Sequence, residues 1–157
     1  MAKKSKKKGA LTYCPLLLLI GSLLVIVSAF FPASTLKKTD WTFSGWNMAF
    51  GYKAGTGVGE VDYFAFSFMN LLPYILSLSA LFIVLVNVGD KKPSATSYLI
   101  ASVCLVVAGV LVLISIPLAQ MHPLLKDGLE LGYGAIIGGT TSLLLGGASA
   151  TLLVLKK

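Results

Sequence analysis

Few side chains in this sequence can act as acids, bases, nucleophiles or metal ligands. The 157 residues include six acidic side chains, one histidine and two cysteines. The candidates for chemistry in the loops are Asp40, Glu60, Asp62, His122, Asp127 and Glu130. Their spacing is not that of a paired general acid and base, and one histidine without further ligands does not make a metal site. The sequence therefore predicts a protein that is not an enzyme and that holds no metal or cofactor.

Two further features look like chemical motifs and are better explained otherwise. Cys14 and Cys104 lie within apolar runs, where a free thiol packs as a small hydrophobe. Lipid attachment at Cys14 is the alternative. The glycine-rich segment at 55–59 looks like a phosphate-binding loop, but it lacks the preceding strand and the following helix that such a loop requires.

The composition indicates a membrane protein. Hydrophobic residues make up 56% of the chain and charged residues only 12%, against roughly 25% charged residues in soluble domains. A helix of about 20 apolar residues crosses the hydrocarbon core of a bilayer. Four segments meet this length without any Asp, Glu, Lys, Arg or His: residues 11–31, 64–88, 96–118 and 131–155. Backbone groups in lipid must be paired within their own segment, so these runs are predicted to be helices.

We therefore expect an all-α membrane protein with a four-transmembrane-helix bundle. Residues 11–157 form the membrane domain, and residues 1–10 form a basic cytoplasmic arm without fixed structure. The loop at 33–63 has room for a short β-strand or helix. A cleaved secretory signal is the alternative for the first span, because residues 27–29 loosely fit a cleavage site, but its apolar run exceeds the roughly 7–15 residues of a signal.

The lysines predict how the chain threads the membrane. The N-terminus, the loop at 89–95 and the C-terminus carry nine lysines and one acid, whereas the other two loops carry four lysines and five acids. Because lysines near span ends are retained on the cytoplasmic side, both termini are predicted to be cytoplasmic. The net charge of +7 does not indicate nucleic-acid binding, because these lysines flank spans and the chain has no arginine.

Small residues recur every four positions in the last predicted span and so share one helix face. They are Gly134, Gly138, Ser142, Gly146 and Ala150. In lipid, such a face lets two helix backbones pack closely. We expect it to pack within the monomer, with the seam of a homo-oligomer as the alternative. In the second span, Pro73 is predicted to kink the helix, and Asn70 to bond to a freed carbonyl or to a neighbouring element.

The first outer loop is rich in aromatic residues. The predicted interaction surface consists of Trp41, Phe43, Trp46, Phe50 and Tyr52. Residues 41–43 alternate as a short strand does, and the four glycines of 51–59 predict a turn. Aromatic side chains favour the membrane–water interface. The loop is therefore expected either to fold onto the outer helix ends or to bind a partner, a lipid or an envelope component.

The segment Phe43–Gly51, with the sequence FSGWNMAFG, resembles a group of small bacterial four-span membrane proteins. The resemblance covers the order of the spans and these nine residues, and it implies no activity. Four spans with a tryptophan-bearing first loop also look like claudin-type tetraspan proteins. That family carries a cysteine pair in its first loop and this chain has none there, so no claudin function is implied.

Two functional hypotheses follow. The favoured one is a non-enzymatic tetraspan scaffold or partner-modulating protein, which meets the lipid bilayer and either another membrane protein or a second copy through its last span. The alternative is a subunit of a small oligomeric transporter or channel. Ion pathways usually need ionisable residues inside the membrane, and the four predicted spans have none.

Overall fold

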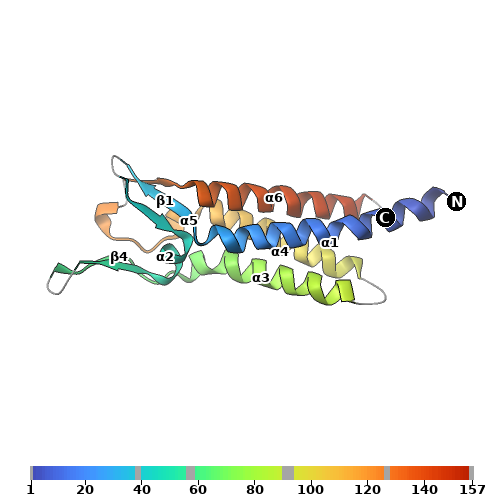
Figure 1. The fold of residues 1–157 in the computed structure, drawn as a ribbon, viewed down its shortest axis with the longest axis horizontal. Helices are drawn as coiled ribbons and strands as arrows, with labels where there is room; N and C mark the ends of the chain where they lie inside the picture. Colours follow the sequence, from blue (N-terminus) through green and yellow to red (C-terminus); the bar gives the residue numbers. More distant parts are fainter. Residues whose placement is uncertain (1, 38–39, 56–58, 90–93, 126–127, 156–157) are drawn as a thin grey trace.

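The computed structural model describes every residue except 1, 38–39, 56–58, 90–93, 126–127 and 156–157. Within the described residues, four long helices lie side by side along the longest axis of the molecule (Figure 1): α1 (Ala2–Ser28), α3 (Phe68–Gly89), α4 (Ala95–Leu113) and α6 (Tyr133–Val154). A head of short strands and helices lies at one end of these helices, and the chain termini lie at the other (Figure 1). The fold is therefore mostly helical, as expected, but it also contains small sheets.

Three of the described helices are long and apolar enough to cross a membrane. They are α3, α4 and α6, with 22, 19 and 22 residues, whereas the apolar part of α1, Tyr13–Ser28, is shorter. The segment predicted at 96–118 is not one helix, because α4 ends at Leu113 and a separate short helix, α5 (Ser115–Leu118), follows. Pro117 accounts for this break, because it has no N–H to donate to the carbonyl of Leu113.

The N-terminal end differs from the expectation. Residues 1–10 are predicted to form an arm without fixed structure, but α1 begins at Ala2 and continues past Pro15. Lysine has a helix propensity close to that of leucine, and each residue added to an existing helix gains a backbone hydrogen bond at little cost. The basic residues that the structure describes here are therefore a helical extension of α1.

On one side of α6, small residues face α1. A Cβ atom built on Gly138 would overlap the Oγ of Ser28, and one built on Gly134 would lie 2.9 Å from the Cβ of Phe31. Contacts this short do not occur between packed side chains, so both positions accept only glycine while α1 stays where it is. Gly138 thus packs against α1, and Gly134 packs against the segment that follows α1 in the same chain.

On the other side of α6, small residues face α4. Ser142 is fully buried, and its Oγ donates to the carbonyl oxygen of Leu105 at 3.1 Å. A Cβ atom built on Gly146 would lie 3.1 Å from the carbonyl oxygen of Ser102. Ala150, one turn further along, is half-buried. The small residues therefore do not form one continuous seam, because Gly134 and Gly138 lie on the side of α1 and the segment after it, whereas Ser142 and Gly146 meet α4.

The head is built from the two loops at the end of the helices opposite the termini. Its elements are β1 (Pro32–Leu36), β2 (Thr42–Ser44), α2 (Gly45–Phe50), β3 (Tyr52–Ala54), β4 (Val61–Phe64), α5, the 3-10 helix η2 (Pro123–Leu125) and β5 (Leu129–Leu131). An antiparallel sheet has the order β2-β1-β5, so the first loop pairs with the second. β3 and β4 form a hairpin, and the carbonyl of Tyr63 on β4 accepts from the backbone N–H of His122 at 3.0 Å. These two connections make the head one folded unit.

The head also corrects the expected boundaries of the outer loops. The strand expected at residues 41–43 is present as β2, and the glycine that interrupts it, Gly45, begins α2. Leu131, which was assigned to the last span, belongs to β5. The glycine-rich residues 56–58 and the loop lysines at 38, 91, 92 and 126 lie outside the described residues.

Candidate functional site

The five aromatic residues predicted to form one interaction surface lie in two places. Phe43 is 2% exposed and is the centre of an enclosed group of rings, which we call the head cluster: Phe43, Tyr52, Tyr63 and Phe64. The ring centroids of Tyr52, Tyr63 and Phe64 lie 5.7, 6.2 and 4.9 Å from that of Phe43. Phe43 is therefore a core residue of the head, and it does not belong to the predicted surface.

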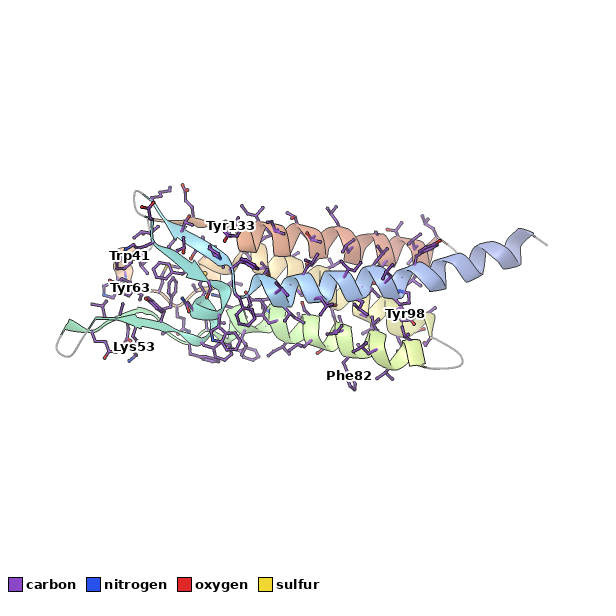
Figure 2. The ribbon with its side chains drawn as sticks, in the orientation of Figure 1. Trp41, Lys53, Tyr63, Phe82, Tyr98 and Tyr133 are labelled. Atoms are coloured by element: carbon purple, nitrogen blue, oxygen red, sulfur yellow. The ribbon has the colours of Figure 1, made fainter. Side chains whose placement is uncertain are left out.

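Trp41 lies at the margin of the head cluster. Its ring meets that of Tyr63 edge to face at 5.7 Å, and 51% of the residue is exposed. Both residues lie within the head, away from the ends of the long helices (Figure 2). Trp41 thus closes the cluster on one side and presents its other side to the surroundings.

The remaining two residues of the predicted surface belong to a second row of rings, which we call the junction ridge: Phe30, Trp46, Phe50 and Phe66. Trp46 stacks on Phe30 at 5.7 Å and contacts Phe50 at 4.2 Å, and Phe50 contacts Phe66 at 6.4 Å between ring centroids. All four are 43–67% exposed. The ridge follows the line where the helices meet the head, because Phe30 follows α1 and Phe66 precedes α3.

Helix α2 carries two residues of the ridge, and local contacts hold this short helix in place. Ser44 caps it, since its Oγ accepts from the N–H of Asn47 at 3.2 Å. The N–H of Trp46 donates to the carbonyl of Ala29 after α1 at 2.9 Å. The N–H of Ser67 donates to the carbonyl of Ala49 at 2.9 Å. Backbone bonds therefore tie α2 to the head-side ends of both α1 and α3.

Asn70 adds a side-chain bond to the same arrangement. It is 3% exposed, and its Nδ2 donates to the carbonyl of Met48 on α2 at 3.4 Å. The expected bond from Asn70 to a neighbouring element is confirmed, and the neighbour is the head rather than another long helix. Pro73 lies one turn further along an unbroken α3. The ridge is thus carried by a fixed element and not by a free loop.

A pocket opens beside the junction ridge, between the end of α2 and the β3–β4 hairpin. Its volume is about 410 Å³, and its apolar walls include Phe50, Phe64 and Phe66. Gly51 forms part of the wall with φ = 95°, and a Cβ there would lie 3.0 Å from the carbonyl oxygen of Phe64. Only glycine adopts this conformation without strain, so the chain passes close to β4.

An ion pair forms the polar rim of this pocket. The Nζ of Lys53 lies 3.0 Å from the Oδ1 of Asp62 across the hairpin, and both side chains are 62% exposed. The hydrogen bond to Asp62, then the charges of Asp62 and Glu60, raise the pKa of Lys53 above its ordinary value. Lys53 therefore stays charged and lies among more negative than positive charge.

The other residues with reactive side chains do not come together. Asp40 and Glu60 are exposed, and Glu130 pairs with Lys37 at 3.4 Å on the other sheet. His122 is half-buried next to β4, where its backbone is bonded to Tyr63. In the described part of the chain, no group of three or more His, Cys, Asp or Glu side chains is arranged to hold a metal ion. Asp127 lies outside the described residues.

A second, smaller groove lies between α1 and the start of α6. Its volume is about 130 Å³, and its lining is almost entirely apolar, with Leu24, Phe31, Tyr133 and Ile137 among its residues. The glycine at 134 forms its base. This groove is on the side of the helices and has no charged residue in its lining, so it offers apolar contact only.

The pocket at the hairpin was missed by sequence reasoning, although parts of its signal are readable. Residues 52–54 and 61–64 alternate in polarity around a glycine-rich turn, which is the pattern of a β-hairpin. A hairpin places Lys53 opposite Asp62. The sequence does not reveal that the end of α2 lies beside this pair. No family model, curated protein or solved structure matches the chain.

Proposed function

We propose that the chain is a four-span membrane protein, with both termini in the cytoplasm and the head outside. Its function is that of a non-enzymatic scaffold that holds the head at the outer membrane surface for a lipid or protein partner. One observation carries this proposal: the exposed aromatic rings of the junction ridge lie where the apolar helices meet the folded head. Exposed aromatic rings are typical of the membrane–water interface.

The outward surfaces of the helices support the membrane location. Phe82 on α3 points away from the other helices (Figure 2) and is 69% exposed, and Leu144 on α6 is 71% exposed. Large apolar side chains cover the same surfaces along α3, α4 and α6. Soluble proteins rarely expose continuous apolar surface of this extent, because its contact with water is unfavourable. A lipid environment removes that cost.

The proposal counts α1 as a membrane span in addition to α3, α4 and α6. The apolar part of α1, Tyr13–Ser28, has 16 residues, and at 1.5 Å per residue it extends for about 24 Å. Phe30 and Phe31 continue its apolar surface toward the head. A span somewhat shorter than the hydrocarbon core is accommodated by local thinning of the bilayer. The length of α1 is therefore compatible with a complete crossing.

The charge distribution supports the orientation. The termini lie at the end of the helices opposite the head (Figure 1). The terminal segments and the loop at 89–95 have a net charge of +8, whereas the two loops that build the head have a net charge of −1. Positive loops remain in the cytoplasm, which leaves the head outside.

The helix interior favours a scaffold over a transporter or channel subunit. The contacts between α6 and its neighbours are made by glycine, serine and apolar side chains, and backbones approach closely at Gly109 and Gly139. None of the sequences of α3, α4 and α6 contains Asp, Glu, Lys, Arg or His. A path for ions usually has ionisable or water-lined positions inside the membrane. The folded head is the part with polar and aromatic binding groups.

The two tryptophans of the chain provide a direct test. Trp41→Phe leaves Trp46 in the junction ridge, and Trp46→Phe leaves Trp41 within the head, away from the helix ends. Each variant is reconstituted into bilayers whose lipids carry bromine at a known depth on the acyl chain. We expect bromines just below the headgroups to quench Trp46 strongly and Trp41 weakly. Equal quenching of the two residues, or a chain that stays dispersed without detergent, contradicts the proposal.

A further inference from the structure

The pocket beside the β3–β4 hairpin has an apolar part and a charged part with a fixed relation to each other. Phe50 and Phe66 are its exposed walls, with their ring centroids 6.4 Å apart. Both also belong to the junction ridge, so under the proposed function they lie at the level of the lipid headgroups. Lys53 and Asp62 form its rim further out on the hairpin. From the ridge outward, the pocket therefore changes from apolar to charged, which is the order from acyl chains to headgroup in a phospholipid.

The size of the pocket is that of a ligand site. Its volume of about 410 Å³ lies within the roughly 300–1,000 Å³ of pockets that hold small molecules. Gly51 in its wall lets the end of α2 pass close to the backbone of β4, because any side chain at this φ of 95° would be strained. The pocket is wide enough for a headgroup, and its open side lets acyl chains continue along the ridge.

The charges on the rim select the type of headgroup. Lys53 offers N–H donors to an anionic oxygen, and Asp62 offers a carboxylate to an ammonium group. Glu60 adds a second negative charge that acts on this position. A headgroup with only a negative charge would meet Lys53 and be repelled by two carboxylates. A headgroup with both a phosphate and an ammonium group satisfies both members of the pair.

We propose that this pocket binds the headgroup of a zwitterionic phospholipid with a primary ammonium group, of the phosphatidylethanolamine type. The phosphate lies at Lys53, the ammonium group at Asp62, and the acyl chains pass Phe50 and Phe66 into the bilayer. The proposal rests on the membrane location proposed above and gives the head a specific lipid partner.

The second ion pair of the head supplies a matched control. Lys37, which follows β1, and Glu130 on β5 are also opposite charges, with Nζ and Oε1 3.4 Å apart and similar exposure. Neither residue lines the pocket. A double variant of each pair therefore removes the same charges from the same head, and only one of the two variants changes the proposed site.

The test is competition between two lipids for the full-length protein. Wild type is purified in detergent, exposed to equal amounts of dioleoyl phosphatidylethanolamine and dioleoyl phosphatidylglycerol, and the retained lipid is measured by native mass spectrometry. We expect a preference for the ethanolamine lipid on the order of tenfold, the effect of one additional charge-assisted hydrogen bond. Lys53→Gln with Asp62→Asn abolishes the preference, and Lys37→Gln with Glu130→Gln retains it.

Three results would overturn the proposal: no preference in wild type, a preference that survives in the pocket variant, or a loss that is equal in both double variants. A second experiment needs only the wild-type protein and therefore still tests the proposal if the pocket variant does not fold. A photoactivatable ethanolamine lipid with a diazirine near the glycerol is cross-linked in bilayers, and labelling is expected within residues 50–53 and 62–66. Labelling confined to other surfaces excludes this pocket.

These outcomes are separable from failure of the membrane proposal. If the chain is not a membrane protein, it will not require detergent, and Trp41 and Trp46 will be equally insensitive to brominated lipids. If it is a membrane protein without this lipid site, the tryptophan depths will differ as expected while the two lipids compete equally. Each proposal therefore has a result that contradicts it alone.

Discussion

The long helices and the head are packed by residues of opposite size. Where α4 meets α6, the contact is made by small residues: a Cβ on Gly109 would lie 2.8 Å from the carbonyl oxygen of Gly139. In the head, three large rings gather around Phe43. Straight helices that lie along one another gain most from close backbone approach. Short strands in two separate sheets leave a wide gap between them, which large flat rings fill.

This comparison teaches that a small residue and a large one can be equally irreplaceable. Gly109 cannot accept one more carbon, and Phe43 cannot lose the six carbons of its ring, because each is closely surrounded. Exposure, and not residue type, separates these positions from their neighbours. Gly147 on α6 has open space where a Cβ would be, and Phe30 in the junction ridge is 67% exposed. The following predictions test that distinction.

The largest effect is expected from removing the central ring of the head. Phe43→Ala should lower the free energy of unfolding of the head by about 4 kcal/mol, because it leaves a cavity between rings that cannot collapse together. Phe30→Ala, in the junction ridge, should cost about 1 kcal/mol for the loss of one aromatic pair. Both values come from denaturant unfolding in detergent micelles, followed by tyrosine near-ultraviolet circular dichroism. Equal losses at the two positions would contradict the enclosed head cluster.

In the helices we expect a smaller effect on stability, and its sign should differ between two glycine positions. Gly109→Ala should destabilise the protein by about 2 kcal/mol, because its methyl group meets the backbone at Gly139 and the Oγ of Ser142. Gly147→Ala should be neutral or stabilising, because the new methyl group meets nothing within 4 Å and alanine is the better helix former. Thermal unfolding measured by far-ultraviolet circular dichroism distinguishes the two. A destabilised Gly147→Ala protein would show that this face is covered by something other than the chain itself.

The hydrogen bond between α6 and α4 should contribute less than their close packing. Ser142→Ala removes the bond from its Oγ to the carbonyl of Leu105, and interhelical bonds of this kind average about 0.6 kcal/mol in membrane proteins. Thr140→Ala is the control, because its hydroxyl bonds only to its own helix, at Ile136, and is exposed. The difference between the two variants in thermal unfolding should be small but reproducible. A loss at Ser142 as large as that at Gly109 would contradict the dominance of close packing.

Much of the helical part of this fold is readable from the sequence. The lengths of the uncharged runs predict α3, α4 and α6 to within a few residues at most of their ends. The exceptions have identifiable causes, one local and one long-range. Pro117 ends α4 early, and Leu131 leaves the last helix because it pairs with Ser34 of the first loop. A hydropathy pattern carries no information about such a partner from a distant loop.

The head and its pocket could be predicted only in fragments. The alternation around Phe43 predicts β2, but it does not tell whether the buried face of that strand meets lipid, water or other rings. The pairing of β1 with β5 joins residues that are almost a hundred positions apart, and nothing local encodes it. The pocket depends on the same long-range arrangement, because Phe50 and Asp62 come from different elements. The sequence therefore identifies the aromatic and charged residues that build the head, but it does not tell which of them are buried and which are exposed.

The smallest effect concerns the exposed ion pair and tests whether charge contributes to the head as packing does. Its acidic member Asp62, together with the nearby Glu60, raises the pKa of Lys53 above the ordinary value of 10.5, because negative charge favours the charged amine. The resulting stabilisation is complete below pH 10.5 and is lost as the pH rises through the raised pKa of the folded protein. Carbon-13 NMR of the lysine ε-carbons should show Lys53 titrating above pH 10.5, and Asp62→Asn should bring it down toward that value. Glu130→Gln should leave the pKa of Lys53 unchanged, because Glu130 pairs with Lys37 instead.

Since both members of the Lys53–Asp62 pair are largely exposed, water screens their attraction, so Asp62→Asn should leave the unfolding temperature of the protein nearly unchanged. A drop comparable to that of Phe43→Ala would mean that charge, and not the ring cluster, holds the hairpin to the head.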